Sequence, residues 1–155
     1  NPDSYEILFE LGRLAFDEVA QALPDVQHAT IDEIFDKHGE AYFRSGERRV
    51  ILRLIGEGAS VLATGGGAYM DATTRALLKE KATTIWLRAE LDVIWKRVSR
   101  RDTRPLLKRP NPKQVLTDLA AARAPVYAEA DIVVDSGEAP ASDAVKKIRE
   151  ALGFA

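Results

Sequence analysis

The sequence predicts an α/β fold in three layers, in which helices cover both faces of a parallel sheet. Short apolar or β-branched runs alternate with helical patterns along the chain, as in repeated β-then-α units. One apolar run stops at Gly65, Gly66 and Gly67. Glycines at the carboxyl end of a strand let a ligand lie directly against backbone N–H groups, although a Gly-Gly-Gly sequence alone is also typical of a flexible turn.

The expected strands are three short segments, at residues 60–64, 82–87 and 131–135. Each precedes a helical pattern, at 71–80, 91–100 and 141–152, and Asp71 is placed to cap the first of these helices. Two more helices are expected at 30–35 and 38–55. Helical periodicity predicts an apolar stripe on two of these helices. In the helix at 38–55 the stripe is formed by Phe43, Val50, Leu52 and Ile55, and in the helix at 141–152 by Val145, Ile148 and Leu152.

Composition indicates one soluble globular domain over residues 1–155, since 46% of the residues are hydrophobic and 30% are charged. A formal charge of −2 does not favour nucleic acid or an anionic membrane as partner. The chain has no cysteine and two histidines, which excludes disulfides, thiolate metal sites and a histidine-rich zinc site. Without a signal peptide or a membrane-length apolar run, the expected location is the cytoplasm.

A basic, proline-containing segment at residues 101–114 interrupts the alternation of strands and helices. Its prolines predict an irregular loop rather than a helix. Arg97 and Arg100, just before it, extend the positive charge. This pattern favours a lid that closes over an anionic ligand, and a solvated connection is the alternative.

Four motifs, in this order and at these spacings, resemble those of bacterial shikimate kinases: 39–47 (GEAYFRSGE), 64–67 (TGGG), 101–107 (RDTRPLL) and 123–127 (RAPVY). The resemblance runs from about Thr30 to the C-terminus. It implies a P-loop nucleoside monophosphate kinase-like fold. It also implies an enzyme of aromatic amino acid biosynthesis that uses ATP and Mg²⁺ to phosphorylate the 3-hydroxyl of shikimate. A monomer is expected, although the sequence does not reveal the oligomeric state.

By this resemblance, Arg44 and Arg123 bind the carboxylate of shikimate, and the three glycines at 65–67 form a backbone wall against its ring. A planar guanidinium suits a carboxylate because it can donate two parallel hydrogen bonds. Glu47 follows Arg44 by three residues, on the same helical face, and can orient its guanidinium. A structural salt bridge without a ligand is the alternative interpretation of this pair.

The resemblance also assigns residues to ATP. Arg104 matches the lid arginine that reaches the phosphates and stabilises the charge of the transferring group, which gives it a catalytic role. Arg97 matches the arginine that packs on adenine, and the loop at 136–140 matches the segment on the other side of the base.

The N-terminal region, residues 1–29, departs from the family. The sequence contains neither the Gly-x-x-x-x-Gly-Lys-[Ser/Thr] phosphate loop nor an Asp-x-Asp, and residues 1–23 show instead an amphipathic helical pattern. Gly12 is followed by Arg13, and Asp17 and Asp25 lack a strand before them, so the metal ligands stay unknown. Three explanations are open: the loop residues are missing from this sequence, the region is naturally degenerate, or it has been rebuilt.

Other function classes compete with the kinase. A non-catalytic scaffold would keep the residues that bind shikimate but would not bind nucleotide. A related small-molecule kinase, such as a gluconate kinase, shares the scaffold but not the Phe-Arg-x-x-Glu and Arg-Pro-Leu-Leu motifs. A nucleic-acid binder is not supported, because the basic residues gather in one loop without interleaved aromatics.

Overall fold

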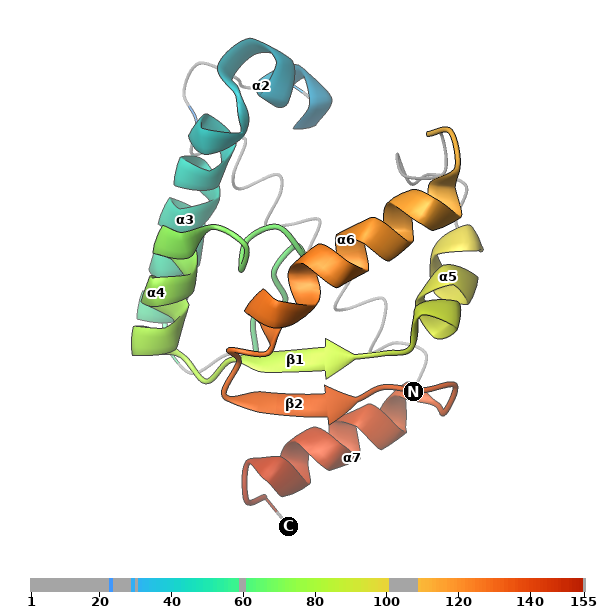
Figure 1. The fold of residues 1–155 in the computed structure, drawn as a ribbon. Coiled ribbons are helices and arrows are strands. Elements are labelled where there is room, and N and C mark those ends of the chain that lie inside the picture. Colours follow the sequence, from blue (N-terminus) through green and yellow to red (C-terminus); the bar gives the residue numbers. More distant parts are fainter. Residues whose placement is uncertain (1–22, 24–28, 30, 59–60, 101–108, 155) are drawn as a thin grey trace. The chain divides into compact units, whose positions relative to one another are not determined.

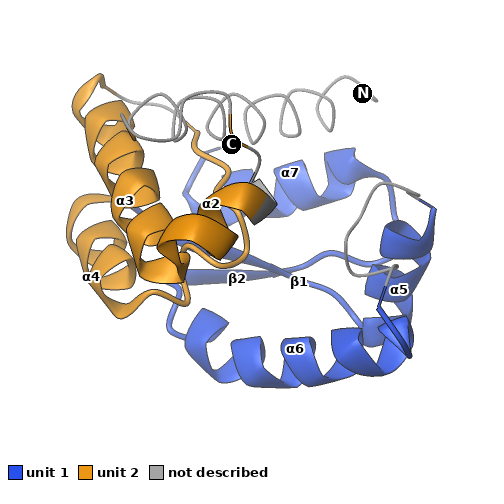
Figure 2. Ribbon diagram, turned by 90° about the horizontal axis from the view of Figure 1, so that it is seen from above, with its two compact units in different colours: residues 1, 83–155 blue, residues 2–82 orange. Residues whose placement is uncertain are grey.

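The computed structural model describes residues 23, 29, 31–58, 61–100 and 109–154. The chain forms two compact units, one of residues 2–82 and one of residues 83–155 with residue 1 (Figure 2). Residues 1–22 of the expected N-terminal helix and most of the expected lid, including Arg104, lie outside the described residues. That the whole chain forms one domain stays a prediction.

Three described helices belong to residues 2–82: α2 (Ile31–His38), α3 (Glu40–Gly56) and α4 (Ala72–Lys81) (Figure 1). All three were expected from the sequence. The boundary between α2 and α3 falls later than predicted because Gly39 has φ 80°, which only glycine adopts easily and which no α-helix contains. The second helix therefore begins at Glu40 rather than at His38.

A small apolar core holds α2 and α3 together. Its buried members are Leu23, Ile34, Phe43 and Val50, and the rings of Phe35 and Phe43 pack at a tilt, 5.1 Å apart. A Cβ at Gly46 would lie 2.9 Å from the Leu23 side chain, so a larger residue there would displace Leu23 from the core. Two members of the predicted α3 stripe are therefore confirmed, Phe43 and Val50.

Leu52 was wrongly placed in the same stripe, since it is 46% exposed while the neighbouring Ile51 is buried. Positions 50 and 52 differ by about 200° around a helix, which puts them on opposite faces.

The strand expected at 60–64 is also wrong for Val61–Thr64, which have no regular secondary structure. Val61 is 81% exposed. The described sheet contains β1 and β2 alone, so this segment has no described strand beside it to complete its hydrogen bonds.

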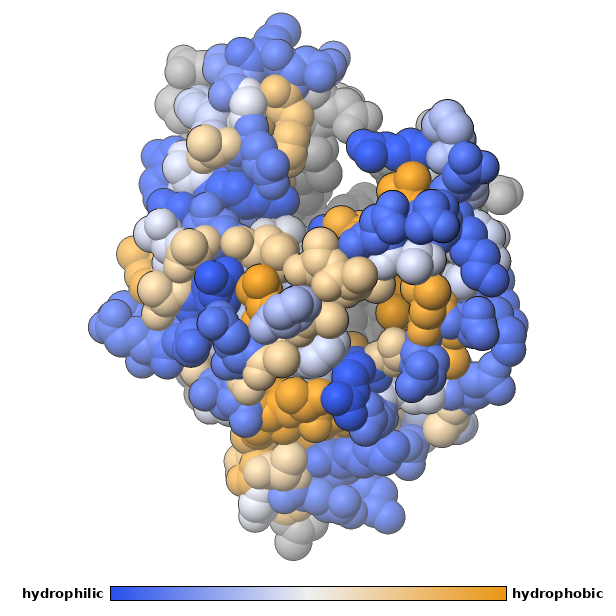
Figure 3. Space-filling model, viewed as in Figure 1, coloured by the Kyte–Doolittle hydropathy of each residue, from blue (hydrophilic) through white to orange (hydrophobic). Residues whose placement is uncertain are grey.

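The second unit contains a parallel pair of strands, β1 (Ile85–Arg88) and β2 (Ile132–Asp135), in which Trp86 lies opposite Val133 and Arg88 opposite Asp135. Its helices are α5 (Leu91–Ser99), α6 (Pro112–Tyr127) and α7 (Ala141–Ala151). Figures 1 and 2 show α6 and α7 on opposite sides of the strands, so this unit has the predicted three layers. Two apolar residues of the strands, Leu87 and Val133, are exposed. Figure 3 shows apolar surface gathered on the face of the molecule that it draws.

The sequence reasoning missed α6. Its first turn lies within the segment expected to be irregular, so the prediction was wrong for residues 112–114. Pro112 is compatible with a helix because it stands at the first position, where its missing N–H would have no helical acceptor. Pro125 falls in the last turn of α6, which therefore includes the motif at 123–127.

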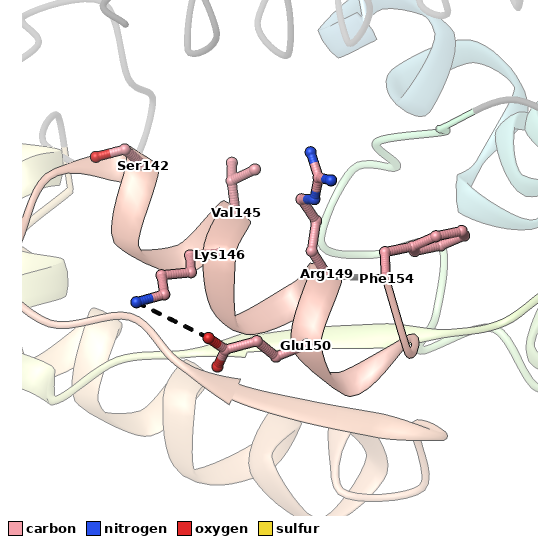
Figure 4. A pocket seen from close by; sticks show the side chains of 6 residues that line it. All are labelled: Ser142, Val145, Lys146, Arg149, Glu150 and Phe154. Carbon is pink, nitrogen blue, oxygen red and sulfur yellow. Dashed lines mark ion pairs between the residues drawn. The ribbon is translucent and has the colours of Figure 1, made fainter.

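The expected helix at 141–152 is confirmed as α7, but no residue of α7 is fully buried, and Val145 and Leu152 are exposed. A shallow pocket of about 310 Å³ lies along α7 and is lined by Ser142, Val145, Lys146, Arg149, Glu150 and Phe154 (Figure 4). None of the predicted site residues lines it. Among the described helices, none has the length and apolar character needed to cross a membrane.

Candidate functional site

The guanidinium of Arg44 lies directly against the glycine loop at Gly67. A Cβ built on Gly67 would lie 2.0 Å from Nη2 of Arg44 and 2.7 Å from its Cζ, closer than real atoms approach. The loop can therefore hold this arginine only because residue 67 has no side chain. The two motifs that the sequence placed 23 residues apart, around Arg44 and Gly67, thus meet in one place.

Arg44 is held by carboxylates of its own helix. Its Nη1 donates to Oε1 of Glu47 at 2.7 Å, and both side chains are only 14% exposed. The more exposed Glu40 accepts from Nε and Nη2 at 3.4 Å each. A partly buried ion pair at helical spacing fixes the plane of the guanidinium, as the sequence predicted for Glu47.

The glycine loop runs into α4 through two turns. The N–H of Ala68 donates to the carbonyl of Gly65 at 3.1 Å, and that of Met70 donates to the carbonyl of Gly67 at 3.2 Å. Gly65 itself lies near Glu47, with Oε2 3.8 Å from the position of an added Cβ. The loop therefore presents bare backbone beside the Arg44 and Glu47 pair.

Asp71 caps α4 as predicted, and it does more than that. Its Oδ1 accepts from the N–H of Thr74 at 2.8 Å and from Nη2 of Arg48 at 2.9 Å. The Thr74 N–H most of all, and then Arg48, lower the pKa of Asp71 to about 2, against partial burial, which raises it. The sequence reasoning missed Arg48, although its position one helical turn after Arg44 was a usable signal.

A second group of candidate residues belongs to residues 83–155. Arg97 of α5 donates to Oγ of Ser136 from both Nη atoms at 3.2 Å, and to the carbonyl of Gly137 at 2.6 Å. The structure therefore brings together Arg97 and the loop at 136–140, which the resemblance assigns to the two sides of adenine. Beside them, Lys96 pairs with Glu138.

This loop leaves the sheet at its carboxyl edge, where open α/β sheets bind their ligands. Arg88 and Asp135 end the two strands and pair through two bonds of 2.7 and 3.0 Å. The N–H of Ser136 then donates to the carbonyl of Arg88 at 2.7 Å. The first residue of the loop is therefore fixed to both strands, and Arg97 approaches a well-defined backbone.

Of the remaining predicted site residues, Arg123 and Arg104, the structure describes only the first. Arg123 lies in the last turns of α6 and is partly buried, and no described residue pairs with its guanidinium. Arg104 lies outside the described residues. Among those described, no three His, Cys, Asp or Glu side chains lie close enough together to hold a metal ion.

A parallel sheet between helices, an arginine on a glycine loop and a basic residue at the carboxyl edge suit an α/β protein that binds anionic ligands. Comparison with known proteins identifies the family. The family model "Shikimate kinase" matches residues 8–153, and the chain belongs to that family. It accordingly has the P-loop nucleoside monophosphate kinase-like α/β fold of its structural neighbours.

Individual relatives agree. A shikimate kinase of Caulobacter vibrioides is 53% identical over 123 residues, which are 79% of this chain and 62% of the relative. One of Novosphingobium aromaticivorans is 44% identical over 149 residues, covering 94% of this chain and 77% of the relative. The solved shikimate kinase of Acinetobacter baumannii in complex with shikimate is 33% identical, with a TM-score of 0.73, covering 94% of this chain and 87% of that one.

Proposed function

We propose that the chain transfers the γ-phosphoryl group of ATP to the 3-hydroxyl of shikimate. The observation that carries the proposal is the contact of the Arg44 guanidinium with the bare backbone of Gly67, in a chain whose family match covers residues 8–153. The chain spans less than two thirds of the Caulobacter vibrioides relative, so the activity of the whole protein needs its own test.

Shikimate has one carboxylate and three hydroxyls on a small ring. Arg44 offers the planar donor pair that a carboxylate needs, and its low exposure, 14%, strengthens any charge-assisted bond there. Glu47 prevents the guanidinium from rotating away. Arg123 is assigned as the second donor to the carboxylate, and the backbone of Gly65, Gly66 and Gly67 as the wall that the ring lies against.

In the reaction, the 3-hydroxyl oxygen forms a bond to the γ-phosphorus while the bond to the β,γ-bridging oxygen breaks, so that ADP leaves and the hydroxyl proton is released. Such a step needs positioning and positive charge more than covalent participation by the protein. Arg104 is assigned to stabilise the transferring group. Arg97, fixed on the loop at 136–140, is assigned to the adenine.

Mg²⁺ supplies positive charge to the phosphate oxygens in reactions of this class. The described residues offer no cluster of metal ligands, so no side chain is assigned to the ion. The resemblance further places the reaction in aromatic amino acid biosynthesis, and we propose a cytoplasmic monomer.

A second candidate function is a scaffold that binds shikimate without phosphorylating it. One observation favours it: residues 1–155 contain no Gly-x-x-x-x-Gly-Lys-[Ser/Thr]. That loop grips the phosphates with consecutive N–H groups, a helix N-terminus and a lysine. Arg97 and Arg104 by themselves would attract ATP weakly and with strong salt dependence.

A coupled assay that follows ADP release with shikimate and ATP separates the candidates, provided that the mass of the polypeptide is measured first. A polypeptide heavier than 17.1 kDa that carries a Gly-Lys-Ser or Gly-Lys-Thr near Gly12 is expected to turn over. One of 17.1 kDa is expected to bind shikimate with negligible turnover. Robust phosphorylation by the lighter polypeptide would refute this account of the phosphate grip, and failure of both to bind shikimate would refute both functions.

A further inference from the structure

Helix α3 contacts the segment at 65–71 with two arginines that are one helical turn apart. Arg44 meets the segment at Gly67. Arg48 meets its end, since Nη2 donates to Oδ1 of Asp71 at 2.9 Å and Nε donates to Oγ1 of Thr74 at 3.2 Å. One helix therefore fixes the glycine loop at two points.

The chain between these points is short and internally bonded. Three residues separate Gly67 from Asp71, and the N–H of Met70 donates back to the carbonyl of Gly67 at 3.2 Å. At the far end, Oδ1 of Asp71 also accepts from the N–H of Thr74, a residue that is fully buried. A displacement of Asp71 relative to α3 would therefore move Gly67 relative to Arg44.

The contact of Arg48 depends on a guanidinium. Two different donor atoms of one rigid plane reach two acceptors on the first turn of α4. The side chains of Arg48 and Asp71 are 30% and 25% exposed, so the pair is partly shielded from water. A lysine could keep the bond to Asp71 but could not reach Thr74 from the same geometry.

We propose that Arg48 is a positioning residue for shikimate: it fixes the glycine loop against α3, so that Arg44 holds its carboxylate-binding orientation. Arg48 acts through Arg44 and the loop and touches no substrate itself. The inference rests on the proposed function, because it concerns the same binding site.

The test compares shikimate binding by calorimetry in the parent and in Arg48→Met, which keeps the aliphatic length and removes the donors. We expect Arg48→Met to weaken binding about tenfold, in the range typical of coupled neighbours. Arg48→Lys should lie between the two. Arg49→Met is the matched control, since Arg49 is the next residue on α3 and is exposed, and it should bind like the parent.

Coupling to Arg44 separates positioning from a general loss of stability. In an Arg44→Lys background, where the bidentate grip is already absent, Arg48→Met should weaken binding less than twofold. The methyl ester of shikimate, which lacks the carboxylate charge, should bind the parent and Arg48→Met equally.

Each result has a definite meaning. A full tenfold loss in the Arg44→Lys background, or an equal loss for the ester, would overturn the proposal, as would parent-like binding by Arg48→Met. If Arg48→Met does not fold, Arg48→Lys takes its place in the three comparisons, which are shikimate binding, shikimate binding in the Arg44→Lys background and binding of the methyl ester. Parent-like binding by Arg48→Lys in all three then overturns the proposal. If the parent does not bind shikimate, the proposed function is refuted. If the parent binds shikimate and the Arg48 variant binds equally well, only the role of Arg48 is refuted.

Discussion

Replacing Gly67 with alanine should separate shikimate binding from folding. The new Cβ would lie 2.0 Å from Nη2 of Arg44, whereas ordinary contacts begin at 3.4 Å. The guanidinium must therefore retreat by about 1.4 Å, the difference between these distances. Backbone strain is not expected, since Gly67 is not among the described glycines with positive φ.

The displaced atoms are the far end of a flexible side chain, so the fold should absorb the change. Alanine also restricts the unfolded chain, which by itself stabilises by about 0.4–1 kcal/mol. For binding, a retreat of about 1.4 Å is enough to break charge-assisted hydrogen bonds, each contributing about 1.5–3 kcal/mol. We therefore expect shikimate affinity to fall by about 10-fold to 150-fold while the melting temperature changes little.

Calorimetry with shikimate and thermal unfolding without ligand are the two assays. Gly56→Ala is the matched control, because a Cβ at Gly56 meets nothing within 4 Å. The double variant of Gly67→Ala with Arg44→Lys should bind no more weakly than the weaker single variant, since both changes disturb one guanidinium. Unchanged affinity in Gly67→Ala, or a loss fully additive with Arg44→Lys, would refute the reasoning.

Three further predictions concern the same sites. Arg44→Lys should weaken shikimate binding by about 1.5–3 kcal/mol with the fold intact, because lysine cannot donate two parallel bonds. Equal affinity by calorimetry would show that Arg44 does not bind the carboxylate. In a polypeptide that turns over, Arg104→Ala should lower kcat far more than it raises KM for shikimate, and unchanged kcat would reduce the loop to a connector. Asp71→Asn should lower the free energy of unfolding by up to about 2 kcal/mol at about pH 6, because the pKa of Asp71 is lowered from 3.8 to about 2 in the folded state. That stability is present above the unfolded pKa and is lost as pH falls from about 4 to about 2, so urea unfolding should show the two proteins converging there; a gap that persists at about pH 2 would contradict the assignment.

Local signals in the sequence predicted much of the fold. Helices α4, α5 and α7 and strands β1 and β2 follow periodicity and capping, which depend on neighbouring residues alone. The wrong predictions concern segments whose structure depends on more than the local pattern of residues. Val61–Thr64 have strand-like composition, but a strand also needs a neighbour, which no local pattern supplies. In α6, Pro112 indicated an irregular segment, but it stands at the first helical position, where proline is tolerated.

The candidate site shows the same division. The ion pair of Arg44 and Glu47 was predictable because three residues on a helix fix the distance. The contact of Arg44 with Gly67 and the bonds from Arg48 to Asp71 join different elements, so spacing along the chain could not give them. Roles for Arg97, Arg104 and Arg123 came from the family resemblance and stay predictions.

In the proposed site, Arg44 and the glycine loop bind the carboxylate of shikimate. Calorimetric titration of shikimate into the mass-verified polypeptide, with the methyl ester in parallel, measures this interaction. Shikimate should bind saturably at one site, and the ester should bind more weakly by about tenfold or more, because the charge-assisted bonds to Arg44 are lost. Absence of saturable binding, or equal affinity for acid and ester, would contradict it.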